Sequence, residues 1–312
     1  MQTMTPMKRL TRPENPRPFE ITERDVDILA FVARVRFATT DQIVRFTAGS
    51  EKNVGTRIRL LFWHALLDRC EHQSALVALF NQVGNTSSIY QLGTVGKKLL
   101  AQRGILPMTS RARSPLIPHS VATTEFILAV ALATRADGAP RLVDHGDLLL
   151  AMPEATRLLE HPFRFRVPHQ EDFRAISLNA DPDRLMSLIY PDQHRHNYCV
   201  ELDMGTETVA RRRNGKILLG KSTIARKQAA YFLGWSQGRH RSQWGWQGFR
   251  VLTITPSERR VASMIEAQRE ITNDRASALF LYTTPQRLAE HGAFAPVWIS
   301  SERDDISIID RT

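Results

Sequence analysis

Residues 181–206 read DPDRLMSLIYPDQHRHNYCVELDMGT, and this stretch decides how the second half of the chain folds. Two apolar runs, 185–190 and 198–202, flank a polar segment that begins at Pro191. Proline followed by aspartate and further polar residues is typical of a turn. The pattern therefore predicts an antiparallel hairpin that reverses near residues 192–194.

Three carboxylates converge at the open end of this predicted hairpin. Paired positions in an antiparallel hairpin have a constant index sum, so Asp183 is expected opposite Glu201 to Asp203. Glu201 and Asp203 share a face because they are two residues apart on one strand. Clustered carboxylates repel one another unless a cation lies between them, and hard oxygen ligands suit Mg²⁺ or Mn²⁺. The sequence thus predicts a divalent-cation site; alternatively, the acidic residues pair with Arg211–Arg213.

Basic residues concentrate just after this stretch. Residues 205–250 hold ten Lys or Arg and one acidic residue, an excess close to the net charge of +10 that the whole chain carries. Three of the five tryptophans lie in the same segment, and we expect them mainly in the core because large aromatic side chains mostly bury. Such a basic segment suits a polyanion, and nucleic acid is favoured over membrane because no basic amphipathic helix accompanies it. The cations expected to contact DNA here are Arg211, Arg212, Arg213, Lys216 and Lys221.

The N-terminal part reads as three helices followed by a hairpin. Thr22, Thr39 and Ser50 each precede an apolar helical pattern and can serve as N-caps. Strand-like runs at 75–83 and 89–92 flank a polar turn. This order is that of a winged helix-turn-helix, whose third helix enters the major groove of DNA.

The third predicted helix has an apolar side and a polar side. Its DNA-facing candidates are Lys52, Asn53, Thr56, Arg57 and Arg59. The alternative is a protein-docking module of the same fold, since fold alone does not determine function.

The chain divides into segments of different character. Residues 1–20 are polar and rich in proline and read as a flexible leader, and 108–118 reads as a linker between a domain at 21–107 and a second at 119–312. In the second domain, strands and helices alternate after Phe249, which predicts a mixed sheet. The expected fold class is therefore α+β or α/β.

These residues carry a resemblance to a known family. Pro182-Asp183, then Glu201-Leu-Asp203 with Gly205-Thr206 following, resembles the PD-(D/E)xK nuclease-like core. More specifically, the order of elements over residues 20–300 resembles the replication-relaxation family of plasmid and mobile-element proteins. That family joins an N-terminal winged helix to a nuclease-like domain with an E-x-D-x-G-T motif and a helical K-x3-Y, here Lys227 and Tyr231.

The resemblance implies a function in replication, relaxation or mobilisation of a plasmid, phage or integrative element. If the core is active, Asp183, Glu201 and Asp203 hold Mg²⁺ or Mn²⁺, Lys227 assists the attacking water, and Glu125 adds a fourth ligand. This sequence has Asp203 where an active core usually has lysine, which favours the alternative of a DNA-binding or transcription-regulatory protein with a degenerate nuclease fold.

Several classes of protein find no support in the sequence. No apolar run approaches the roughly 20 residues of a membrane helix, and no apolar segment follows the basic N-terminus as in a signal peptide. We therefore expect a cytoplasmic protein without a membrane partner. No GxxxxGK[ST] or GxGxxG motif occurs, so no nucleotide cofactor is expected. A zinc site at His194, His196 and Cys199 lacks a fourth ligand. A homodimer, or a complex with a replication or mobilisation protein, stays open.

Overall fold

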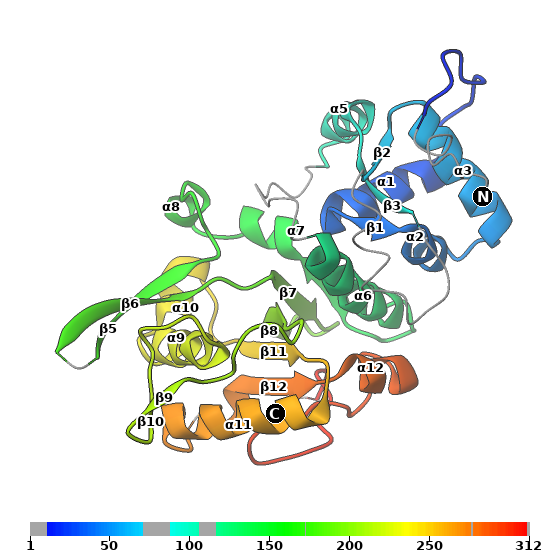
Figure 1. Ribbon diagram of the computed structural model, residues 1–312. Helices are drawn as coiled ribbons and strands as arrows, with labels where there is room; N and C mark the ends of the chain where they lie inside the picture. The colour runs from blue at the N-terminus through cyan, green and yellow to red at the C-terminus, as the bar shows by residue number, and fades with distance from the viewer. Residues whose placement is uncertain (1–10, 71–87, 106–116, 172, 276, 311–312) are drawn as a thin grey trace, which may run out of the picture. The chain divides into compact units, whose positions relative to one another are not determined.

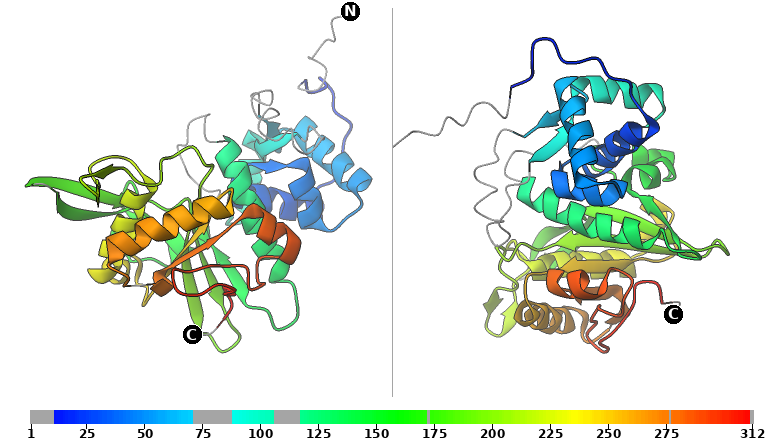
Figure 2. Two further views of the ribbon diagram at one scale, coloured as in Figure 1. Left: turned by 60° about the horizontal axis from the view of Figure 1, so that its bottom comes forward. Right: turned by 90° about the vertical axis from the view of Figure 1, so that its right-hand side faces the viewer.

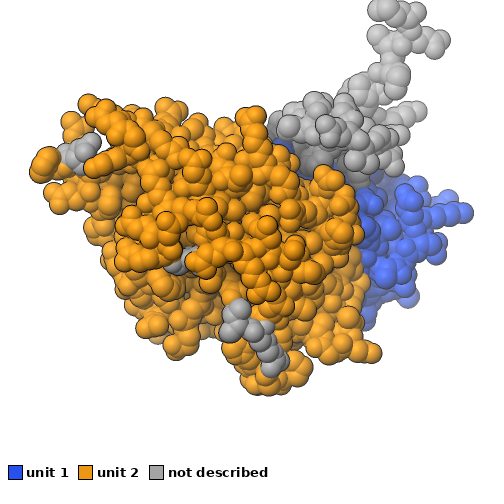
Figure 3. Space-filling view, turned by 90° about the horizontal axis from the view of Figure 1, so that it is seen from below, with its two compact units in different colours: residues 1–128 blue, residues 129–312 orange. Residues whose placement is uncertain are grey.

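The computed structural model describes residues 11–70, 88–105, 117–171, 173–275 and 277–310. The chain forms two compact units, residues 1–128 and residues 129–312 (Figure 3). Helix α6 (Ile117–Ala133) crosses this division, whereas the predicted linker at 108–118 lies mostly outside the described residues. Both units combine helices and strands, so the expected mixture of α and β structure is confirmed.

The first unit contains helices α1, α2 and α3, a small sheet, and α5 (Figure 1). Before α6, its elements are α1 Glu23–Val35, β1 Ala38–Thr39, α2 Thr40–Thr47, α3 Glu51–Trp63, β2 Leu67–Arg69, β3 Ile89–Leu92 and α5 Thr94–Gln102. The strands form an antiparallel sheet in the order β1-β3-β2. The predicted strand at 89–92 is therefore confirmed, while the one at 75–83 and the turn that follows it lie outside the described residues.

The three predicted N-caps are confirmed. The side chains of Thr22, Thr39 and Ser50 accept hydrogen bonds from backbone amides in the first turns of α1, α2 and α3. At α1 and α2 the arrangement is reciprocal, because Asp25 and Gln42 accept hydrogen bonds from the backbone of Thr22 and Thr39. Local sequence therefore sets where these helices begin.

Close backbone packing joins α5 to the end of α3. A Cβ atom added to Gly96 would lie 2.2 Å from the carbonyl oxygen of Leu66, and one added to Gly93 would lie 2.2 Å from that of Ala65. Neither distance is possible for a real side chain, so both positions require glycine. These contacts fix α5 against the chain segment that leads into β2.

The second unit is built on a mixed sheet of five strands in the order β12-β11-β8-β7-β4. Its elements are β4 Arg141–Asp144, α7 His145–Leu150, α8 Glu154–Arg157, β5 Phe165–Glu171, β6 Arg174–Ala180, β7 Arg184–Ile189, β8 Arg195–Leu202, β9 Arg212–Arg213, β10 Lys216–Ile217, α9 Ile224–Ser236, α10 Arg239–Trp244, β11 Arg250–Ile254, α11 Glu258–Thr272, the 3-10 helix η3 Ser277–Leu279, β12 Phe280–Thr283 and α12 Pro285–His291. Strands β8, β11 and β12 are parallel to one another, whereas β7 is antiparallel to both β8 and β4.

Two smaller sheets accompany the five-stranded sheet. Strands β5 and β6 pair over seven positions as a two-stranded arm that extends beyond the main sheet (Figures 1 and 2). Strands β9 and β10 form a short hairpin whose turn includes Gly215. The sequence pattern predicted neither of these hairpins.

The core of the second unit lies between the five-stranded sheet and α9, α10 and α11. Strands β8 and β11 contribute Cys199 and Val251, and α9 contributes Tyr231. Trp244 and Trp246 are buried in the same cluster, which bears out the expectation that most of these aromatic side chains belong to the core. The sheet positions the end of β8, and the N-cap Thr223 sets the start of α9, where the candidate site lies.

Candidate functional site

The hairpin β7–β8 has the register that the sequence predicted. Arg184 pairs with Val200, so one step further along the ladder Asp183 comes beside Glu201. The carboxylate of Asp183 accepts a hydrogen bond of 2.8 Å from the amide of Leu202. The turn thus brings an early aspartate back to the acidic end of β8.

Helix α9 supplies the partners of Glu201. The hydroxyl of Tyr231 donates a hydrogen bond of 2.5 Å to Glu201 Oε1, and Lys227 Nζ lies 3.6 Å from Oε2. Lys227 and Tyr231 face the strand together because they are four residues apart on one helix. The predicted K-x3-Y pair therefore contacts the glutamate directly.

Lys227 also bridges to a second carboxylate. Its Nζ lies 3.3 Å from Glu207 Oε2, and Glu207 accepts a hydrogen bond from Ser222. Burial lowers the pKa of Lys227, but the carboxylates of Glu201, Asp183 and Glu207 outweigh it and raise the pKa above its ordinary value. The lysine is accordingly a fixed cation among three carboxylates.

Asp203 is held by a different helix. Arg260 on α11 binds both of its carboxylate oxygens, and Thr255 donates a hydrogen bond of 2.7 Å to one of them. Burial raises the pKa of Asp203, but the hydrogen bonds from Arg260, Thr255 and the amide of Gly205 bring it below its ordinary value. Asp203 is therefore an ionised partner of Arg260, not of the Arg211–Arg213 run that the alternative interpretation favoured.

The carboxylate oxygens that a cation would need are thus engaged by the protein itself. In the part of the chain that the structure describes, no group of three or more His, Cys, Asp or Glu side chains is placed to hold a metal ion. Two of the three carboxylates that would bind the metal form ion pairs instead: Glu201 pairs with Lys227, and Asp203 pairs with Arg260. This geometry does not fit a three-carboxylate metal centre, so Mg²⁺ or Mn²⁺ binding stays a prediction from the sequence.

Glu125, which the sequence suggested as a fourth metal ligand, binds side chains of α2. It belongs to the first compact unit, where Arg45 donates two hydrogen bonds to its carboxylate at 2.7 and 2.6 Å and Gln42 donates a third at 3.1 Å. Burial raises the pKa of Glu125, but these partners lower it below its ordinary value. Glu125 is thus a structural link between α2 and α6, and its role as a fourth metal ligand stays a prediction from the sequence.

Helix α3 presents most of its predicted DNA-facing side chains to solvent. Lys52, Asn53, Thr56 and Arg59 are all exposed. The guanidinium of Arg59 lies over the ring of Trp63, one turn further along the helix. These residues form one polar, cationic face.

Arg57 requires a correction. Its guanidinium turns toward α1 and binds both carboxylate oxygens of Asp25, whose side chain is fully buried, and it donates a further hydrogen bond of 2.8 Å to the carbonyl of Glu20. It also lies over the ring of Phe19. Arg57 stabilises the first unit and is not available to DNA.

The basic hairpin β9–β10 divides in the same way. Arg211, Arg213, Lys216 and Lys221 are exposed. Arg212 instead lies against α11, where it pairs with Glu266 and Glu270. Arg212 is exposed as well, but its ion pairs anchor the hairpin to α11.

Sequence reasoning missed several of these partners. The sequence pattern gives no reason to single out Arg260, Thr255 or Ser222. A threonine at the end of a buried strand and an arginine in the next helix are common patterns, so no local signal marks them as partners of a distant aspartate.

Taken together, a first unit of helices around a small antiparallel sheet and a second unit built on a mixed sheet define a two-unit α+β protein. The replication-relaxation family model matches residues 29–236, which is 208 of the 312 residues, and the chain belongs to this family. No curated protein and no solved structure matched the chain. Within the described residues, no helix combines the length and the apolar character needed to span a membrane.

Proposed function

We propose that this protein binds duplex DNA of a plasmid or mobile element during replication or relaxation, and that it holds this DNA without cutting it. The observation that carries the proposal is the exposed polar and cationic face of α3. Family membership supports a role in replication or relaxation, and the net charge of +10 supports a polyanionic partner.

The first unit has the parts of a winged helix-turn-helix. Helices α2 and α3 are joined by residues 48–50, in which Ala48 adopts a left-handed conformation with φ of 51°. Strands β2 and β3, which follow α3, complete a three-stranded antiparallel sheet with β1, which precedes α2. A short turn of this kind is typical of helix-turn-helix units, whose second helix reads the major groove. In this proposal, α3 enters the groove with Lys52, Asn53, Thr56 and Arg59 toward the DNA.

A salt titration tests this interface without knowledge of the recognised site. Each cation that contacts a phosphate contributes about 0.9 to the slope of log K against log salt concentration. We expect Lys52→Ala and Arg59→Ala each to lower this slope by about 0.9 on a random-sequence duplex. Lys98→Ala is the matched control, because Lys98 is also exposed but lies on α5. Equal slopes for wild type and all three variants would refute the assignment of α3.

The ion pairs at the end of β8 support the second half of the proposal. A nuclease centre needs free carboxylate oxygens for the metal and a lysine free to act on the attacking water. Here Arg260 binds both carboxylate oxygens of Asp203. Lys227 forms ion pairs with both Glu201 and Glu207. We infer that these groups hold α9 and α11 to the sheet.

Incubation with supercoiled plasmid separates binding from cutting. The wild-type protein should yield no nicked or linear product with Mg²⁺, Mn²⁺ or EDTA. Nicked or linear product that needs a divalent metal, and that Glu201→Gln and Asp203→Asn abolish when purified identically, would overturn this half of the proposal. Such a result would instead establish a metal-dependent nuclease.

A further inference from the structure

The outer end of the β5–β6 arm carries an unusual phenylalanine. The side chain of Phe173 is 98% exposed, and its backbone has a φ of 62°, in the left-handed region. A bulky apolar residue is disfavoured at such a φ, and exposure of its ring to water gains nothing from the hydrophobic effect. Neither property stabilises this chain alone, which points to a contact with another molecule.

The arm that carries Phe173 is firmly built. Near its base, Val167 and Leu178 are fully buried in the core of the second unit. Arg226 on α9 donates hydrogen bonds to the carbonyls of Ser177 and Leu219. These contacts anchor the base of the arm, whose turn carries Phe173.

The arm is also tied to the basic hairpin. The carboxylate of Glu171, two residues before Phe173, accepts hydrogen bonds from the amides of Leu219 and Gly220. The exposed Lys221 directly follows this contact in the sequence, so the contact brings a cationic residue close to the arm.

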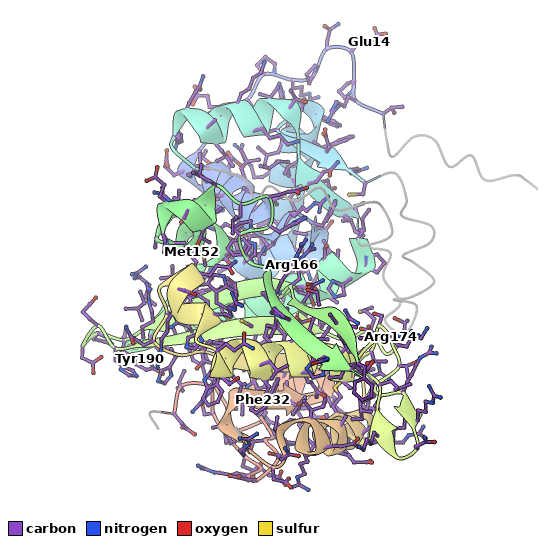
Figure 4. The ribbon with its side chains drawn as sticks, turned by 90° about the vertical axis from the view of Figure 1, so that its left-hand side faces the viewer. Glu14, Met152, Arg166, Arg174, Tyr190 and Phe232 are labelled. Carbon is purple, nitrogen blue, oxygen red and sulfur yellow. The ribbon has the colours of Figure 1, made fainter. Side chains whose placement is uncertain are left out.

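Further cations flank the same region. Arg174, the first residue of β6, is exposed directly after Phe173, whereas Arg166 lies on β5 toward the base of the arm (Figure 4). Arg213 and Lys216 are exposed on the neighbouring hairpin. Glu171 and Arg212, by contrast, are engaged within the protein and do not alter this pattern.

An apolar ring beside several cations matches the chemistry of nucleic acid. The cations suit phosphates, while the ring suits the faces of bases, on which aromatic side chains stack or between which apolar side chains insert. We propose that the arm is a second DNA contact, in which the β9–β10 hairpin holds the phosphates and Phe173 inserts against the bases. This inference rests on the proposed DNA-binding function and deepens it by adding an element that unstacks bases.

The test compares Phe173 variants with the intact full-length chain. Phe173→Ala should weaken binding to a duplex by about tenfold at every salt concentration, because stacking on a base is lost, and should leave the salt slope unchanged. Lys216→Ala should instead lower the slope by about 0.9. A duplex containing 2-aminopurine should become more fluorescent with wild type, through unstacking, and not with Phe173→Ala.

Two further variants guard against trivial explanations. Phe173→Gly suits the left-handed backbone, so it should fold at least as well as wild type and show the same DNA-binding defect as Phe173→Ala. Leu158→Ala removes another exposed apolar side chain, at the C-cap of α8, and should bind like wild type.

The outcomes separate this inference from the proposed function. Wild-type affinity and wild-type 2-aminopurine signal in both Phe173 variants would overturn the inference and leave DNA binding by α3 intact. A wild-type chain that binds no duplex at low salt would overturn the proposed function, and the inference with it.

Discussion

Two arginines on α3 are expected to behave in opposite ways when each is replaced by alanine. Arg57 and Arg59 are two residues apart, and sequence alone places both on the DNA-facing side. In the structure, Arg57 binds the buried carboxylate of Asp25, whereas Arg59 is exposed. Arg57→Ala should therefore affect stability, and Arg59→Ala should affect DNA binding.

The size of the Arg57 effect follows from its contacts. Its Nε donates to Asp25 at 2.9 Å, its Nη2 binds the other oxygen, and Nη2 also donates to the carbonyl of Glu20. Removing one partner of a buried ion pair costs about 3–5 kcal/mol. The amide and hydroxyl of Thr22 continue to bind Asp25, and the Arg57 side chain is 25% exposed, so the loss should fall at or below the low end of that range. We expect a loss of about 2–3 kcal/mol in the free energy of unfolding of the first unit.

Hydrogen exchange of the full-length chain measures this loss where it occurs. Amides of α1 should exchange about 30- to 150-fold faster in Arg57→Ala, since 1.4 kcal/mol corresponds to a factor of ten. Arg59→Ala should change the exchange by less than about fivefold, because its contact with Trp63 is exposed. The reasoning is refuted if Arg57→Ala exchanges like wild type, or if it lowers the salt slope of DNA binding as Arg59→Ala does.

Three further predictions concern the candidate site and the fold. Asp203 has a lowered pKa when folded, so its pairing with Arg260 stabilises the protein above the ordinary pKa of 3.8 and is lost as the pH falls through the folded value. Arg260→Gln should thus destabilise the protein at pH 7 and reduce the further loss between pH 5 and 3, which urea unfolding at each pH would reveal; an unchanged pH profile would argue against the pair. Tyr231→Phe should cost about 1–3 kcal/mol in urea unfolding, because Glu201 loses a buried donor, and a neutral effect would contradict that contact. Gly96→Ala should lower the melting temperature by several degrees, since its Cβ would overlap a backbone oxygen, and a variant as stable as wild type would disprove the close approach.

Local sequence determined much of the fold. The N-caps at Thr22, Thr39 and Ser50 and the strand at Ile89–Leu92 lie where the pattern predicted them. These features depend on residues a few positions apart, so the sequence encodes them directly. The β7–β8 register was predictable for the same reason, because a short turn fixes which residues pair.

Only the tertiary structure decided how the charged residues are used. Asp183 and Glu201 come together as the register requires, but Asp203 pairs with Arg260, which is 57 residues away in the sequence. Arg57 lies beside the buried stripe of α3, about 200° around the helix from Arg59, and α1 presents Asp25 to it there. Helical and strand periodicity states which side of an element a residue occupies. Which element packs on that side, and with what charge, depends on long-range contacts that no local pattern contains.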